Sequence, residues 1–226
     1  MNIDEAQLIK GIFQHELKNR FRCIVRINGK DELCYVPSSC RLSNFIDLEG
    51  KAVLLTPSIN SITLPLTLLA TAEGRKATIL NLSVANEVVF EALNGRRFSF
   101  LGKRTSARRE VLINGYKADV YIEDTHTAME IKTIISSQKN ALFPSVKSER
   151  SLRQLERIKL LLEEGYNVCY TFVSLSPRVR SIELDRASAF YPAFLACVKK
   201  GMSYYGCSLE YRKGEIGIAA SIEVII

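Results

Sequence analysis

The sequence of 226 residues lacks the short motifs that identify several common enzyme classes. It contains no tryptophan and only two histidines, His15 and His126. Without a serine motif or a partnered cysteine and histidine, nothing in it supports nucleophilic hydrolase chemistry. A glycine-rich loop of the kind that cradles phosphate groups is also absent. The function must therefore be sought in less obvious patterns.

Zinc-binding and membrane-spanning patterns are missing as well. The six cysteines stand at positions 23, 34, 40, 169, 197 and 207, and no two are three residues apart as in a zinc knuckle. The first ten residues include Asp4 and Glu5 and hold no apolar stretch of signal-peptide length. The most apolar run, residues 216–226, is interrupted by Glu223 and is too short to span a membrane. We therefore expect a cytoplasmic protein without a membrane partner, whose reduced thiols mostly pack as small hydrophobic side chains.

The overall composition is that of a globular protein with a basic excess. Hydrophobic residues make up 47% of the chain and charged residues 24%, which excludes a disordered protein. The 31 lysines and arginines outnumber the 24 acidic residues and give a formal net charge of +7. A positive balance favours an anionic partner such as nucleic acid. Most of the excess lies after residue 82.

The first part of the chain has the pattern of short strands and turn residues that is typical of a small β-barrel. Short apolar segments separated by glycine, proline and asparagine predict five strands, at residues 21–27, 32–36, 51–56, 62–70 and 77–82. Asn28-Gly29 is a hairpin turn signal between the first two. Near Val84 the pattern changes, and residues 85–93 predict a helix. We therefore predict a barrel domain over residues 1–82 and a second domain over residues 83–226.

Two later segments combine basic residues with apolar ones. Residues 96–109 contain six basic residues and no acidic one: Arg96, Arg97, Lys103, Arg104, Arg108 and Arg109. A solvated flexible loop and an arm that contacts phosphate groups are equally good interpretations of this segment. Residues 148–164 predict an amphipathic helix whose polar side carries Arg150, Arg153, Gln154 and Arg157. A buried strand over 166–175, a helix over 187–200 and an edge strand over 207–211 complete the predicted elements.

Two predicted hairpins over residues 110–135 bring acidic side chains into one row. The turn at Asn114-Gly115 sets Glu110 opposite Asp119, and a second turn at 123–127 sets Asp119 opposite Glu130. Strand alternation then predicts one core face and one polar face. The core face would hold Val111, Ile113, Tyr116, Ala118, Val120, Ile122, Met129, Ile131 and Ile135, and the polar face Glu110, Lys117, Asp119, Glu130 and Lys132, with Lys117 opposite Lys132.

The row of carboxylates predicts a metal site. Directly opposed side chains lie about 5 Å apart at Cβ, so three acids in a row repel one another. A hard divalent cation would offset this repulsion, because Mg²⁺ binds one or two carboxylates together with water and phosphate oxygens. Lys132 could orient or polarise a metal-bound water, which would suit hydrolysis of a phosphodiester. The alternative is a wet polar face with ordinary glutamate–lysine pairs.

The same residues resemble a known signature and a known family. Asp119 followed after ten residues by Glu130-Ile131-Lys132 resembles the PD-(D/E)xK nuclease signature. Almost the entire chain resembles the sugar fermentation stimulation protein A (SfsA) family. The segments that carry this resemblance are Phe21-Arg22-Cys23, Val36-Pro37-Ser38-Ser39, Asn81-Leu82-Ser83-Val84-Ala85-Asn86, Arg109-Glu110-Val111, Ala118-Asp119-Val120, Met129-Glu130-Ile131-Lys132-Thr133, and Phe143-Pro144 followed by Ser148-Glu149-Arg150.

The resemblance implies an α/β fold in which an OB-like barrel precedes a PD-(D/E)xK restriction-endonuclease-like α/β domain. It also implies that Glu110, Asp119, Glu130 and the Ile131 carbonyl would hold Mg²⁺ or Mn²⁺. Asp119, Glu130 and Lys132 would be the catalytic residues. The family is associated with DNA binding and with regulation of maltose and sugar metabolism, so DNA is the expected partner. If the chain forms an oligomer, we expect a homodimer.

The chain departs from the family pattern at Lys117, where an arginine is usual, and at Gln154, where a histidine is common. Three hypotheses follow. The first is a metal-dependent nuclease whose nucleic-acid contacts come from the basic residues of 96–109 with Lys117, Arg150, Arg153, Gln154 and Arg157. The second is a DNA-binding regulator of sugar metabolism that does not cleave. The third is a metal-dependent hydrolase of small phosphoesters.

Overall fold

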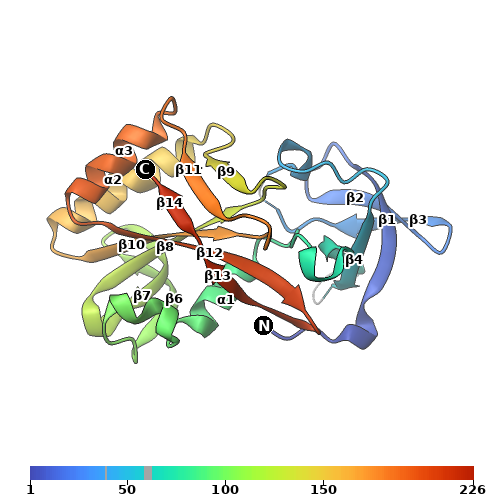
Figure 1. Cartoon of the computed structure of the whole chain (residues 1–226), viewed down its shortest axis with the longest axis horizontal. Coiled ribbons are helices and arrows are strands. Elements are labelled where there is room, and N and C mark those ends of the chain that lie inside the picture. The colour runs from blue at the N-terminus through green and yellow to red at the C-terminus, as the bar shows by residue number, and fades with distance from the viewer. Residues whose placement is uncertain (39, 59–62) are drawn as a thin grey trace.

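The computed structural model describes residues 1–38, 40–58 and 63–226. A barrel built from the first part of the chain lies beside a larger part built on a six-stranded sheet (Figure 1). Three α-helices cover this sheet, which makes the fold a mixed α/β fold, as predicted. No helix among the described residues is long and apolar enough to cross a membrane. All six cysteines are free and five of them are buried, so most of them pack as small hydrophobic side chains, as predicted.

The barrel closes in the strand order β1-β2-β3-β5-β4. Its strands are β1 (Ile9–Glu16), β2 (Arg22–Ile27), β3 (Lys30–Tyr35), β4 (Ala52–Pro57) and β5 (Leu66–Thr71), with short 3-10 helices η1 (Glu5–Gln7), η2 (Leu42–Asn44) and η3 (Gly74–Lys76). Asn28 and Gly29 both have positive φ, at 50° and 81°, as the tight turn between β2 and β3 requires. The predicted strands at 21–27, 32–36 and 51–56 are therefore confirmed.

One predicted strand of the barrel is wrong, and one strand of the barrel was not predicted. The fifth predicted strand, 77–82, is not a strand: only Ile79 forms an isolated bridge, with Ala70. The Ile79 N–H donates to the Leu175 carbonyl at 2.8 Å, because this segment leaves the barrel and joins the larger sheet. The barrel takes its remaining strand from β1, which was not predicted. The alternation of apolar and polar residues in β1 is broken by Gly11 and by a register shift after Phe13. The predicted strand 62–70 begins at residue 62, outside the described residues, and β5 covers its later part.

The larger part has a six-stranded sheet in the order β13-β12-β10-β8-β7-β6. These strands are β6 (Ala107–Ile113), β7 (Tyr116–Ile122), β8 (Thr127–Ile134), β10 (Asn167–Ser174), β12 (Ser203–Arg212) and β13 (Glu215–Ser221), with η5 (Glu123–Thr125) between β7 and β8. Helix α1 (Val84–Ala92) packs on one face, while α2 (Glu149–Glu163) and α3 (Phe190–Lys199) pack on the other (Figure 1). A small sheet of β9 (Asn140–Phe143), β11 (Ser181–Leu184) and β14 (Glu223–Ile225) lies alongside.

Two segments of the larger part differ from their predictions. Residues 96–109 are not a flexible loop, because η4 (Arg96–Leu101) is followed by β6, and Phe98 is fully buried. The predicted edge strand at 207–211 lies within β12, which is not at the edge because β13 pairs with it. The basic segment is therefore held against the body of the protein.

The hairpin register is as predicted, but the assignment to faces is not. Arg109 pairs with Val120 and Val111 with Ala118, so Glu110 lies opposite Asp119. Between β7 and β8 the predicted register holds from Ile122 to Val120, and the pairing ends there. Asp119 and Glu130 therefore lie just beyond the last pair, where the two strands part.

The single core face predicted for these hairpins is wrong, because the sheet is covered on both faces. Val120, Ile122, Met129, Ile131 and Ile135 pack in the core that contains α1. Ile113, Tyr116 and Ala118, with the partly buried Val111, pack instead in the core that contains α2 and α3. Glu110, at the change-over, has a positive φ of 55°. The apolar side chains of β6 and β7 thus change from one face of the sheet to the other at the level of Glu110 and Asp119.

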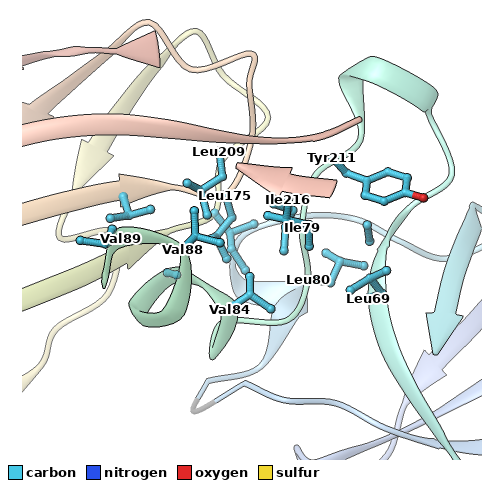
Figure 2. Close-up of a cluster of buried hydrophobic side chains, with 14 of the residues drawn as sticks. Leu69, Ile79, Leu80, Val84, Val88, Val89, Leu175, Leu209, Tyr211 and Ile216 are labelled. Carbon is cyan, nitrogen blue, oxygen red and sulfur yellow. The ribbon is translucent and has the colours of Figure 1, made fainter. Parts of the chain in front are cut away.

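One hydrophobic core joins the barrel to the larger sheet. Leu69 of β5, Ile79 and Leu80 belong to the same buried cluster as Val84 and Val88 of α1 (Figure 2). Leu209 of β12, Ile216 of β13 and Leu175, which follows β10, belong to the same cluster. The N-terminus of the chain also lies against the larger part. Asn2 forms an isolated bridge with Glu215, and the Met1 ammonium lies 2.6 Å from a Glu91 carboxylate oxygen. These contacts fix the barrel against the sheet.

Candidate functional site

A cleft of about 540 Å³ lies where the barrel meets the larger part. Its floor is formed by β8 from Glu130 onward and by Asp119 of β7. Described residues of four further segments surround this floor: Cys40, Phe45 and Leu82; Glu110 and Gly115 to Lys117; Phe143 to Val146; and Ser148, Arg150, Ser151 and Gln154. The cleft therefore brings together the acidic residues, the lysine and the start of α2.

Asp119 is held by donors from two elements. Its Oδ2 accepts a hydrogen bond of 2.7 Å from the Ile131 N–H, and its Oδ1 accepts one of 3.1 Å from Asn86 Nδ2 of α1. The pKa of Asp119 is raised to about 6, first by burial and then by the nearby charge of Glu130, against the opposing effect of the two donors and of Lys132. Near neutral pH this carboxylate is a charged group in a site that disfavours its charge, which suits a cation ligand.

Glu130 is the centre of a hydrogen-bond network. Its side chain is only 2% exposed. Its Oε1 accepts from Lys132 Nζ and from Gln154 Nε2, both at 2.7 Å, and its Oε2 accepts from the Tyr116 hydroxyl. Lys132 Nζ also donates to Gln154 Oε1 at 2.5 Å. Strand β8, strand β7 and helix α2 thus converge on one carboxylate, and its buried charge is fully partnered.

Glu110 does not join the other two acids. Its carboxylate is exposed and accepts from Lys117 Nζ at 2.9 Å, a contact that lowers the pKa of Glu110. Over the part of the chain that the structure describes, no three His, Cys, Asp or Glu side chains are gathered closely enough to hold a metal ion. The predicted row of three carboxylates is therefore a pair, Asp119 and Glu130, with Glu110 at the rim of the same cleft.

The predicted nucleic-acid contacts divide into two groups. Lys117, Arg150 and Gln154 line the cleft, and none of its described lining residues belongs to 96–109. The others lie elsewhere and mostly contact the protein itself. Arg97 donates to the Ala219 carbonyl, Lys103 pairs with Asp124, Arg104 donates to the Leu93 carbonyl, Arg108 pairs with Glu123, Arg109 lies over the Phe90 ring, Arg153 pairs with Glu149, and Arg96 and Arg157 are exposed.

Two residues of the site were not predicted. Asn86 lies in one of the segments that resemble the SfsA family, but an amide on a helix gives no local signal of a carboxylate 33 positions away. Tyr116 was assigned to the core by alternation, and it is indeed buried. A buried tyrosine hydroxyl normally requires a partner, and this is the signal that could have pointed to Glu130.

Comparison with known proteins identifies the family of this chain. A family model described as the sugar fermentation stimulation protein RE domain matches residues 83–215. The chain belongs to the sugar fermentation stimulation protein (SfsA) family. A "Sugar fermentation stimulation protein homolog" of Acetivibrio thermocellus is 24% identical over 98% of both chains. Another, from Natranaerobius thermophilus, is 30% identical over 82% of this chain and 76% of its own length.

A solved structure of an SfsA-family member has the same fold. It is described as Pyrococcus furiosus SfsA in complex with Ca²⁺, and it matches this chain with a TM-score of 0.81 over the full length of both. The sequence identity is 20%, so the likeness bears on the fold. The fold class expected from the SfsA resemblance, a barrel followed by a sheet-rich α/β part, is thereby confirmed.

Proposed function

We propose that this SfsA-family chain is a nuclease of the PD-(D/E)xK type that hydrolyses nucleic-acid phosphodiesters with Mg²⁺ or Mn²⁺. The observation that carries the proposal is the convergence of Asp119, Glu130 and Lys132 in one cleft. Asp119 and Glu130 lie where β7 and β8 part, and the Lys132 ammonium lies 2.7 Å from Glu130. Two acids can hold a metal ion and a neighbouring lysine can stabilise developing negative charge, which suits metal-assisted phosphoryl chemistry.

The donor set fits a hard divalent cation. The available ligands are the carboxylates of Asp119 and Glu130 and the carbonyl of Ile131. Ile131 directs its N–H toward Asp119, and in an extended strand the carbonyl of a residue points to the same side as its N–H. Oxygen ligands of this kind suit Mg²⁺ and Mn²⁺. The Pyrococcus furiosus relative was solved with Ca²⁺, which also takes oxygen ligands. When bound, the cation supplies polarisation of the phosphoryl group and a more acidic water.

The other residues of the cleft would hold the substrate. Lys132 places a positive charge beside the floor, where it would stabilise the negative charge that develops on a phosphoryl oxygen. Gln154 fixes the Lys132 ammonium through its Oε1. Arg150 and the first turn of α2 line the same cleft. Free N–H groups at a helix start and a guanidinium both bind phosphate oxygens well.

A cleavage assay tests the proposal. Purified protein is incubated with single- and double-stranded DNA and RNA in Mg²⁺, in Mn²⁺ and in EDTA. We expect metal-dependent cleavage that falls by about 100-fold or more in both Asp119→Asn and Lys132→Met. The matched control is Glu123→Gln, an exposed acid outside the cleft, which should leave the rate unchanged. Metal-dependent cleavage that survives Asp119→Asn would overturn the assignment of the site.

A second function, a DNA-binding regulator of sugar metabolism that does not cleave, is favoured by one observation. Both Glu130 oxygens already have donors, and Glu110 is paired with Lys117. A cation must compete with these partners, and a site that stays closed would still carry the basic surface of a binding protein. Salt-sensitive DNA binding without cleavage in either metal would support this second function.

A further inference from the structure

We infer that the cleft accepts single-stranded nucleic acid and excludes an intact double helix. The inference rests on the proposed function for the identity of the site and goes further by naming the form of the substrate. It follows from the walls of the cleft, from their attachment to one core and from the chemistry of their side chains.

Separate elements border the floor of the cleft. The barrel contributes Cys40 and Phe45 on one side. The turn between β6 and β7, the chain after β9 and the first turn of α2 contribute Gly115, Pro144 and Ser148. Glu130 is only 2% exposed and Asp119 is half-buried, so the two carboxylates are recessed between these segments and do not stand on a convex surface. A phosphodiester must enter the cleft to reach them.

The size of the space fits a short stretch of one strand. A cavity of about 540 Å³ lies within the range of roughly 300–1,000 Å³ that is typical of pockets for drug-sized molecules. A nucleotide is a molecule of that class. Duplex DNA behaves as a stiff rod with a persistence length of about 50 nm and keeps its bases paired inside. A duplex is too wide to enter a space of this volume unless the walls moved apart, so only its outer backbone could approach the recessed floor.

The walls are not free to move apart. Leu80 and Val84 stand on either side of Leu82 in the sequence, and both belong to the core that joins the barrel to the sheet (Figure 2). The bond from the Ile79 N–H to the Leu175 carbonyl ties the same segment to the chain directly after β10. Swinging the barrel away would expose several core side chains, each worth about 1.5–3 kcal/mol when buried. The cleft width is therefore set by the fold.

The lining has apolar surface for bases beside polar groups for phosphates. Phe45 from the barrel and Phe143 from the end of β9 are both partly exposed in the cleft. Arg150 and Lys117 are exposed at its rim. Aromatic faces stack on unpaired bases, and basic side chains follow the backbone, which is the usual division of labour in single-strand binding. The bases of a duplex are stacked on each other and cannot use the aromatic surface.

Binding is measured by fluorescence anisotropy, first in EDTA and then in Ca²⁺. The probes are a labelled DNA strand of about 12 nucleotides, its RNA counterpart, the DNA strand annealed to its complement, and that duplex with a single-stranded tail. We expect the blunt duplex to bind at least about tenfold more weakly than the single strands, and the tailed duplex to bind like a single strand. A blunt duplex that binds within about twofold of the single strand would overturn the inference.

The aromatic contact is tested with three variants. Phe45→Ala should raise Kd for the single strand by about fivefold or more and leave the weak binding of the duplex unchanged, whereas Phe45→Trp should retain binding. The control is Phe100→Ala, an aromatic residue that is 50% exposed and does not line the cleft. Thermal unfolding identifies loss of folding in Phe45→Ala, and retained binding by a folded Phe45→Ala protein would overturn the role of Phe45.

The two proposals fail in different ways. Preferential binding of single strands without cleavage in Mg²⁺ or Mn²⁺ would remove the proposed hydrolysis and leave the substrate form standing. Cleavage of blunt duplex as fast as single strand would support the proposed hydrolysis and overturn the inferred preference for single strands. In a tailed duplex, cleavage confined to the tail supports both proposals.

Discussion

Asp119 combines two properties that a residue rarely has without a functional reason. It is partly buried beside another acid, which raises its pKa to about 6, yet it is oriented by two hydrogen-bond donors from different elements. A structural carboxylate would gain more from a basic partner than from an acidic neighbour. Its environment therefore resembles that of a group kept ready to bind a positive charge.

The raised pKa makes a prediction about stability in EDTA. The folded state holds the Asp119 proton more tightly than the unfolded chain, whose value is near 3.8. This carboxyl therefore stabilises the fold most at low pH, and that contribution is lost as the pH rises through about 6. Between about pH 5 and pH 8, the stability of Asp119→Asn relative to the natural protein should increase by about 1–2 kcal/mol in urea unfolding.

The control for this measurement is Glu156→Gln, on the exposed side of α2. Its stability relative to the natural protein should change by less than about 0.5 kcal/mol over the same range. A difference between the Asp119→Asn protein and the natural one that stays constant with pH would contradict the raised pKa.

Tyr116 carries the second prediction at this scale. Its hydroxyl donates to Glu130, a carboxylate that is only 2% exposed. Tyr116→Phe removes one donor to a buried charge and should lower the free energy of unfolding by about 1–3 kcal/mol. The matched control is Tyr121→Phe, whose hydroxyl lies 3.0 Å from His126 Nδ1 in an exposed contact and should matter by less than about 0.5 kcal/mol. Equal losses of unfolding free energy in the two variants would show that the buried contact stabilises the fold no more than the exposed one.

At the scale of elements, local signals predicted the turns and the register. Asn114-Gly115 alone fixes the pairing of β6 with β7, because a two-residue turn allows only one alignment. The exchange of faces at Glu110 could not be predicted in this way. Its cause is a positive φ in a residue that rarely adopts one, in a sheet covered by helices on both sides. Alternation therefore placed Glu110, Asp119 and Glu130 in one row, whereas the structure separates Glu110.

Long-range pairing was the other limit. The sheet of β9, β11 and β14 joins three segments in parallel that are far apart in the chain, and no turn signal connects them. Residues 77–82 have the composition of a strand, yet their hydrogen bonds are divided between the barrel and the chain directly after β10. Propensity describes a segment and does not say which partner will satisfy its backbone.

The start of α2 gives a prediction for an element. Ser148 caps this helix by accepting a hydrogen bond of 3.2 Å from the Ser151 N–H, next to the cleft. Ser148→Ala should therefore lower the free energy of unfolding by about 1 kcal/mol in urea. Ser83, which precedes α1, makes no such capping bond, so Ser83→Ala is the matched control and should have a smaller effect. A larger loss in Ser83→Ala would contradict the assigned cap.

For the whole molecule, the core in Figure 2 decides how the protein unfolds. The predicted boundary at residue 83 falls inside a run of core residues, with Ile79 and Leu80 on one side and Val84 on the other. Side chains of the barrel, of α1 and of the sheet share this core, so neither part can lose its structure without exposing apolar surface on the other. The cleft with Asp119 lies at the same junction, and its shape depends on this coupling.

Leu80→Ala tests that coupling. Leu80 is fully buried in the shared core, so its truncation should lower the free energy of unfolding by about 2–5 kcal/mol. Because the core is shared, hydrogen exchange should show equal loss of protection in β2 of the barrel and β10 of the sheet, within one urea transition. Leu112→Ala, at a side chain that is 71% exposed, should leave both unchanged. Loss of protection in β2 alone would mean that the barrel unfolds independently, and the fixed width inferred for the cleft would then fail with it.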